Sequence, residues 1–194
     1  MRQILYRLSP VRRAAVATAS AQRLVCAVSP QDPVRGAEAA RLCEHLWEAL
    51  LKKADVGTLV EADFMRLLDT RPETENDLTG MMDACSTALF YAFRSYADSS
   101  IEDALLALEN VWEDAFQRAF SIEDARRGHS VEGVDSLYDV AEHGAIASRE
   151  RGRQMDDLRI ACSEDSDASV IDNLRERALH SPSLTPAEMA DLRR

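Results

Sequence analysis

The chain has 194 residues, 46% of them hydrophobic, and a formal net charge of −11 at pH 7. No apolar run is long enough to cross a membrane, and the acidic balance repels phosphate groups, so we expect neither a membrane nor a nucleic acid as partner. Few glycines, few prolines and no β-branched runs favour an all-α fold, with residues 1–194 in a single domain. We also expect a cytoplasmic location without a signal peptide.

The charge is unevenly distributed along the chain. Residues 1–31 hold five arginines and no acidic residue, and so carry +5. Since the whole chain carries −11, residues 32–194 carry −16. Ser9 followed by Pro10 is a typical helix start, because serine caps the first turn and proline has no N–H to satisfy there. We predict a first helix over 10–28 that lies on the acidic body; the composition also resembles a transit peptide.

Two further helices are predicted from apolar spacing and capping signals. Residues 34–54 place Leu46 and Trp47 on one apolar stripe, with charged residues on the opposite face. Thr58 and Glu61 form a capping box that opens a short helix ending near residue 69.

The most apolar predicted helix covers residues 77–97. Its large apolar residues recur at intervals of three and four, and Ala84, Ala88 and Phe90 make much of its remaining surface apolar. A helix that is apolar on most sides must be buried on most sides. We therefore predict a bundle of six to eight helices around 77–97 as its central buried helix.

The C-terminal half is predicted to be less regular. A capping box at Ser99 and Glu102 opens a helix that ends near residue 120, and a polar loop follows at 121–133. A longer helix over 134–162 is polar in its middle, so we expect it to extend past the core or to contact a second subunit. A short helix at 168–180 follows, and the tail 182–194 is a candidate for disorder. The predicted core comprises Leu46, Trp47, Leu78, Met82, Cys85, Leu89, Phe93, Leu105, Leu108, Trp112 and Phe116.

Two segments carry a family resemblance. LWEALL at 46–51 and MDACSTAL at 82–89, with the acid-rich helix that ends in DAF, resemble the YjaG-like bacterial family, domain of unknown function 416. The resemblance covers a core of about residues 5–122 and leaves a helical C-terminal part at 134–181. It implies a compact all-α bundle from a bacterial cytoplasm. It implies no activity and no functional residue, because the family has none assigned.

Asp83 is the polar residue that stands out within the apolar helix. A buried carboxylate is costly unless it is paired or hydrogen-bonded. We expect it to be a structural polar anchor that bonds Thr79 or Thr87, or an arginine of the first helix (Arg12, Arg13 or Arg23). A catalytic or ligand-binding carboxylate, or one that reaches water, are the alternatives.

Patterns typical of metal, cofactor or nucleophilic sites are missing. None of the four histidines has a glutamate three residues before it, and no Gly-rich loop could cradle a phosphate. The four cysteines are widely spaced, which favours free structural thiols in a reducing compartment. We expect no cofactor, no metal and no catalytic residue.

Interaction is the function that this pattern favours. We expect a non-enzymatic protein-interaction or assembly module, whose partner is another protein or a second copy of the chain in a homodimer. The alternative is a small-molecule-binding or catalytic helical bundle with a polar pocket around Asp83. A cavity that reaches Asp83 would favour the alternative, and an exposed apolar patch would favour the module.

Overall fold

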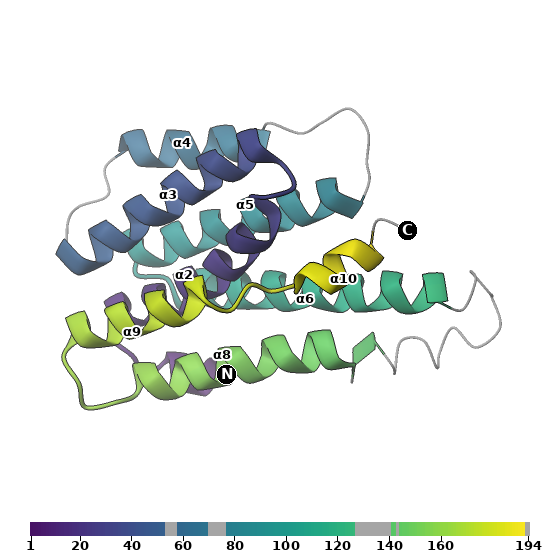
Figure 1. Cartoon of the computed structure of the whole chain (residues 1–194). Helices are drawn as coiled ribbons and strands as arrows, with labels where there is room; N and C mark the ends of the chain where they lie inside the picture. Colours follow the sequence, from purple (N-terminus) through teal and green to yellow (C-terminus); the bar gives the residue numbers. More distant parts are fainter. Residues whose placement is uncertain (53–57, 70–76, 127–140, 143, 193–194) are drawn as a thin grey trace.

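Helices account for all the regular structure that the computed structural model describes. It describes residues 1–52, 58–69, 77–126, 141–142 and 144–192, and for residues 58–60, 77–79 and 126 the backbone alone. Nine helices have both ends within these ranges: α1 (Arg2–Leu5), α2 (Pro10–Val28), α3 (Pro33–Lys52), α4 (Thr58–Asp69), α5 (Asp77–Ala97), α6 (Ile101–Arg126), α8 (Ala145–Ala161), α9 (Asp167–Leu179) and α10 (Pro186–Asp191). The predicted all-α bundle is confirmed (Figure 1). Nine exceeds the expected six to eight because the list includes two short helices, α1 and α10.

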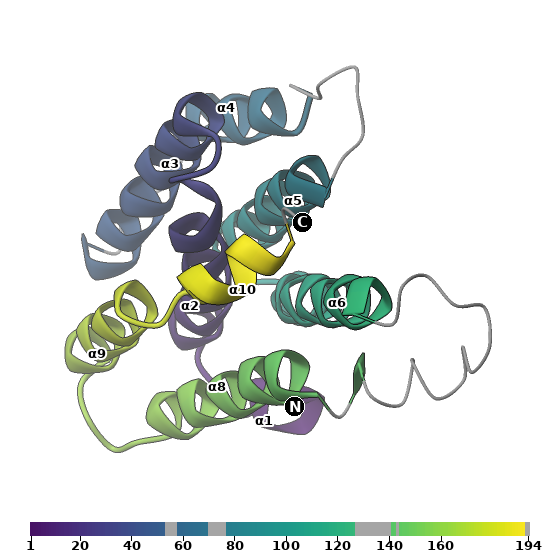
Figure 2. The same ribbon diagram turned by 45° about the vertical axis from the view of Figure 1, so that its right-hand side comes forward.

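Helix α2 runs through the middle of the bundle. Every residue from Arg13 to Val25 is buried, and Figure 2 shows α3, α5, α6, α8 and α9 around it. Many of its residues are alanines, and their short side chains let neighbouring helices pack closely against every face of α2. The predicted start is confirmed, since Ser9 Oγ accepts a hydrogen bond from the Arg12 N–H. The expectation that this helix lies on the body is wrong: it lies inside it.

Helix α5 is buried along one side and half-exposed along another. Met82, Cys85, Leu89 and Phe93 are at most 3% exposed, as predicted. Phe90 and Tyr91, however, are only partly buried. The sequence pattern predicts α5 as the central helix because large apolar side chains dominate hydrophobic patterns. The alanines of α2 contribute little to such a pattern.

The rest of the predicted core divides into buried and half-buried residues. Leu46, Trp47 and Leu108 are buried, whereas Leu105, Trp112 and Phe116 are half-buried. Trp112 stacks on Phe116 with ring centroids 5.9 Å apart. The Arg151 guanidinium lies 4.5 Å from the Trp112 ring centroid, and thus covers this edge of α6. The side chain of Leu78 lies outside the described residues.

The turn between α5 and α6 differs from the predicted capping box. Ser100, and not Ser99, caps α6, since its Oγ accepts a hydrogen bond from the Asp103 N–H at 3.0 Å. Ser99 has a φ of 54°, in the left-handed region that makes a sharp turn between the helices. Arg13 Nη2 donates to the Ser99 carbonyl at 3.1 Å, which ties this turn to α2. Helix α6 also continues beyond residue 120, because Ile122 extends its buried stripe.

Residues 182–192 are ordered against the bundle, although their composition makes them a candidate for disorder. Leu184 and Met189 are 2% and 5% exposed. Thr185 and Glu188 form the capping box that opens α10. The segment is held by buried apolar side chains as well as by its cap, which explains why it does not remain free.

Gly36 lies where α3 passes the end of α2, and its substitution gives a first prediction. A Cβ built at Gly36 would lie 2.5 Å from the Ser29 Cα, well inside van der Waals contact. We expect Gly36→Ala to lower the free energy of unfolding by about 1–3 kcal/mol, measured by urea denaturation. Gly152→Ala is the matched control, because a Cβ there meets nothing within 4 Å. Equal stability of the two variants would show that the α2–α3 corner relaxes freely.

Candidate functional site

Asp83 pairs with an arginine that the sequence did not single out. Arg35 Nη2 of α3 donates to Asp83 Oδ1 at 3.1 Å, and the Asp83 side chain is 32% exposed. The arginines of α2 bond elsewhere, so the expected pairing with Arg12, Arg13 or Arg23 is wrong. Thr87 is partly buried, and the side chain of Thr79 lies outside the described residues. Asp83 therefore belongs to a half-open surface between α3 and α5.

A groove between α3 and α4 opens beside this pair. Its volume is about 490 Å³, and the two helices lie side by side in both ribbon views (Figures 1 and 2). Most residues that line the groove belong to α3. They recur at helical spacing and therefore share one face of that helix. The lining residues are Val34, Arg35, Ala37, Glu38 and Arg41 of α3, and Arg66 and Leu67 of α4.

The rim of the groove is an ion-pair network that joins the two helices. Glu38 Oε1 and Oε2 accept hydrogen bonds from Arg41 at 2.8 and 2.9 Å, and Oε1 also accepts one from Arg66 at 3.1 Å. Asp63 of α4 accepts from the same two arginines at 3.0 and 2.9 Å. The hydrogen bonds from Arg41, followed by those from Arg66, overcome partial burial and lower the pKa of Glu38 to about 2. Glu38 thus stays ionised near neutral pH.

A second charged cluster lies in the interior, on a helix that was expected to leave the core. Arg23 of α2 is 1% exposed, and its Nε and Nη2 donate to Glu150 Oε1 at 3.1 and 2.9 Å. Its Nη1 donates to Asp157 Oδ2 at 2.6 Å. Burial opposes the charge of Arg23, but Glu150 and Asp157 outweigh it and raise the pKa of the guanidinium. In the polar middle of α8, Glu150 and Gln154 are buried whereas Ser148 and Gly152 are exposed, and Glu150 is an acceptor for Arg23.

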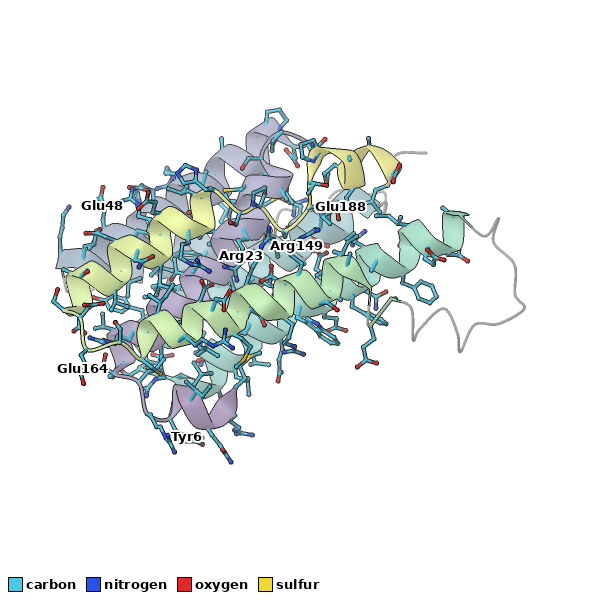
Figure 3. The ribbon with its side chains drawn as sticks, turned by 60° about the horizontal axis from the view of Figure 1, so that its bottom comes forward. Tyr6, Arg23, Glu48, Arg149, Glu164 and Glu188 are labelled. Atoms are coloured by element: carbon cyan, nitrogen blue, oxygen red, sulfur yellow. The ribbon has the colours of Figure 1, made fainter. Side chains whose placement is uncertain are left out.

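The C-terminal segment lies over this cluster. Arg149 Nη2 donates to Glu188 Oε2 at 2.7 Å and to the Ser183 carbonyl at 3.2 Å. The Ser183 N–H in turn donates to the Arg23 carbonyl at 3.1 Å. Figure 3 shows Arg23, Arg149 and Glu188 together where α2, α8 and the segment before α10 meet. Burial opposes the charge of Glu188, but the bonds from Arg149 and Thr185 outweigh it and lower its pKa.

Asp114 of α6 is a buried carboxyl with one satisfied oxygen. Its side chain is 2% exposed, and Arg118 Nε donates to its Oδ1 at 3.2 Å. Oδ2 is buried and has no hydrogen-bond partner among the described residues. Burial raises the pKa of Asp114 to about 6, although Arg118 opposes this shift and Glu150 adds to it. Asp114 is thus the described carboxyl most poised to take up a proton near neutral pH.

Gln22 of α2 organises the cysteines and Trp47 around it. Its Oε1 accepts hydrogen bonds from Trp47 Nε1 at 3.2 Å and from Cys43 Sγ at 3.0 Å, and its Nε2 contacts Cys26 Sγ at 3.5 Å. Burial raises the pKa of the Cys43 and Cys85 thiols, so both stay protonated. All four cysteines are free. The hydrogen bonds of Gln22 with Cys43 and Trp47 join α2 to α3.

The described part of the chain contains no group of three or more His, Cys, Asp or Glu side chains arranged to hold a metal ion. Within it, no helix is both long and apolar enough to cross a membrane.

Comparison with known proteins gives one match. No family model and no curated protein sequence matches this chain. The crystal structure of a DUF416 family protein from Shewanella baltica OS155 matches with a TM-score of 0.72 at 18% sequence identity, covering 93% of this chain and 94% of that one. The chain has the fold of a DUF416 family protein. The resemblance to this family indicated by LWEALL and MDACSTAL is thereby confirmed at the level of the DUF416 fold.

Proposed function

We propose that this protein is a single-domain, non-enzymatic interaction module of the bacterial cytoplasm, and that its site is the groove between α3 and α4. The occupant that we propose is an apolar segment of a partner protein. The observation that carries this proposal is an apolar groove of about 490 Å³ whose rim is fully ion-paired and whose edge exposes a large apolar side chain.

The exposed apolar side chain of Val34 supports a protein segment as the occupant. Val34 lines the groove and is 82% exposed. Such side chains gain free energy when a partner covers them, by roughly 25 cal/mol for each Å² of apolar surface removed from water. A segment that contacts Val34 while entering the groove would bury this side chain together with the apolar lining.

The ion-paired rim supports binding for a second reason. Arg41 and Arg66 are already held by Glu38 and Asp63, so the walls of the groove have a defined shape before anything binds. A preformed site loses less conformational entropy on binding. The apolar lining can therefore contribute most of its burial free energy to affinity.

A groove-filling substitution tests the proposal. Ala37 is exposed and lines the groove, whereas Ala40 is exposed on the same helix and does not line it. Peptides of about twelve residues would be selected by phage display on the wild-type protein, with free Ala37→Trp protein as competitor, and their Kd measured by fluorescence anisotropy. We expect Ala37→Trp to weaken binding of the selected peptides at least about tenfold and Ala40→Trp to leave it unchanged.

The outcome also separates other occupants. If no peptide distinguishes wild type from Ala37→Trp, a protein segment is not the occupant. Concentration-dependent dimers that Ala37→Trp abolishes, measured by analytical ultracentrifugation, would identify a second copy of the chain instead.

A small organic molecule is a second candidate occupant. The volume of about 490 Å³ lies within the range of small-ligand sites, and Arg35, which pairs with Asp83, lines the groove, although Asp83 is not among its lining residues. Screening a fragment collection by ligand-observed NMR, with Ala37→Trp as the blocked control, would detect such binding.

A further inference from the structure

Arg35 is the least hydrogen-bonded arginine of the groove. Its guanidinium can donate five hydrogen bonds. Among the described residues it donates one, from Nη2 to Asp83 Oδ1, and its Nε is buried without an acceptor. Its side chain is 13% exposed, and its buried Nε is not compensated by water.

Arg41, which lines the same groove, has more hydrogen-bond partners than Arg35. Arg41 donates from Nε and Nη2 to both oxygens of Glu38, and from Nη2 to Asp63 as well. Three of its five donors therefore bond carboxylates of the rim, and its Nη1 lies 3.3 Å from His45 Nδ1. Arg35 lines the same groove and has one carboxylate oxygen as partner. The groove thus contains one partly buried cation with hydrogen-bonding capacity to spare.

We propose that the segment bound in the groove presents a side-chain carboxylate to Arg35, beside the apolar residues that fill the groove. This proposal rests on the proposed function. A carboxylate matches the guanidinium in charge and in paired geometry, and such bonds are strongest where water is excluded. Because the whole chain carries −11, a strongly acidic partner would be repelled overall. The chemistry that fits is therefore a mainly apolar segment with one acidic residue.

Asp83 competes with the incoming carboxylate for Arg35. This competition predicts that substitutions of the two residues change peptide affinity in opposite directions. Arg35→Met removes the hydrogen-bond donor, so it should weaken the binding of a selected peptide. Asp83→Asn removes the competing charge and keeps Arg35, so it should tighten the same peptide. A pair that acted only by holding α3 against α5 would respond in the same direction to both changes.

The experiment uses the peptides that Ala37→Trp fails to bind. We expect them to share one acidic position, and we expect Glu→Gln in the peptide or Arg35→Met in the protein to weaken binding about tenfold each, with no further loss when combined. Asp83→Asn should tighten binding by roughly two- to fivefold. Arg159→Met is the control. Arg159 lies in the last turn of α8 with its side chain 73% exposed, so its substitution should leave the Kd of the peptide unchanged. Thermal unfolding of each variant verifies that it is folded.

Each result has a defined meaning. Groove-dependent peptides that tolerate Glu→Gln, or whose binding is weakened alike by Arg35→Met and Asp83→Asn, would overturn the carboxylate proposal and leave the proposed function intact. If no peptide depends on the groove, both proposals fall.

Discussion

Arg23→Met should lower the free energy of unfolding by about 3–5 kcal/mol, the largest effect that we expect from one substitution. Methionine keeps most of the volume of arginine, so the loss is not mainly a cavity. It leaves Glu150 and Asp157, whose side chains are 0% and 1% exposed, with only the longer contacts from Arg153 at 3.8 Å and Arg177 at 3.4 Å. Urea denaturation followed by circular dichroism measures the change.

An exposed ion pair on the same helix provides the control. Arg159 pairs with Asp156, and their side chains are 73% and 51% exposed. Arg159→Met should cost less than about 1 kcal/mol, because water compensates exposed charges. Adding Glu150→Gln and Asp157→Asn to Arg23→Met should recover part of the lost stability, since no unpaired charge then remains. A small effect of Arg23→Met alone would mean that the two carboxylates become protonated or hydrated at little cost.

Asp114→Asn should remove a pH dependence of stability from this protein. The pKa of Asp114 is about 6 in the folded protein, against a reference value of 3.8. The folded state therefore binds this proton more tightly than the unfolded state does. The free energy of unfolding should fall as the pH rises from about 4 to about 6, by up to about 3 kcal/mol, and stay lower above that range.

The asparagine variant lacks the titrating group. Its free energy of unfolding, relative to that of the wild type, should therefore increase as the pH rises from about 4 to about 6. The difference between the two proteins is the quantity to measure, because Glu38 and Glu188 have lowered pKa values and contribute stability that is lost as the pH falls. Denaturation at pH 4, 5, 6 and 7 gives this difference. Asp156→Asn, at a side chain that is 51% exposed, is the matched control. A constant difference between wild type and Asp114→Asn would show that Asp114 titrates alike in both states.

Local signals in the sequence predicted the helices well. Residues 10–28, 58–69 and 77–97 are helical as predicted, because capping residues and apolar spacing act within a few residues of each other. The identity of the central helix was missed, since alanine-rich burial in α2 leaves little apolar periodicity. The polar middle of α8 was read as surface because its partner Arg23 is distant in the sequence.

The candidate site was harder to predict than the fold. Asp83 pairs with Arg35, a partner that the sequence did not indicate because the crossing of α3 and α5 decides that contact. The groove depends in the same way on how α3 and α4 meet. One signal could have located the interior cluster: an acid-free segment with five arginines in an otherwise acidic chain needs acceptors elsewhere.

The position of α2 has a consequence for the order of folding. Arg23 lies 127 residues before Glu150 and 134 residues before Asp157 along the chain. Contacts between such remote positions slow folding, because the entropy of closing the intervening chain is lost before the contacts form. Helix α2 consequently acquires its permanent surroundings only after α8 and α9 have been synthesised. Its short alanine side chains offer little surface for misassociation during that interval.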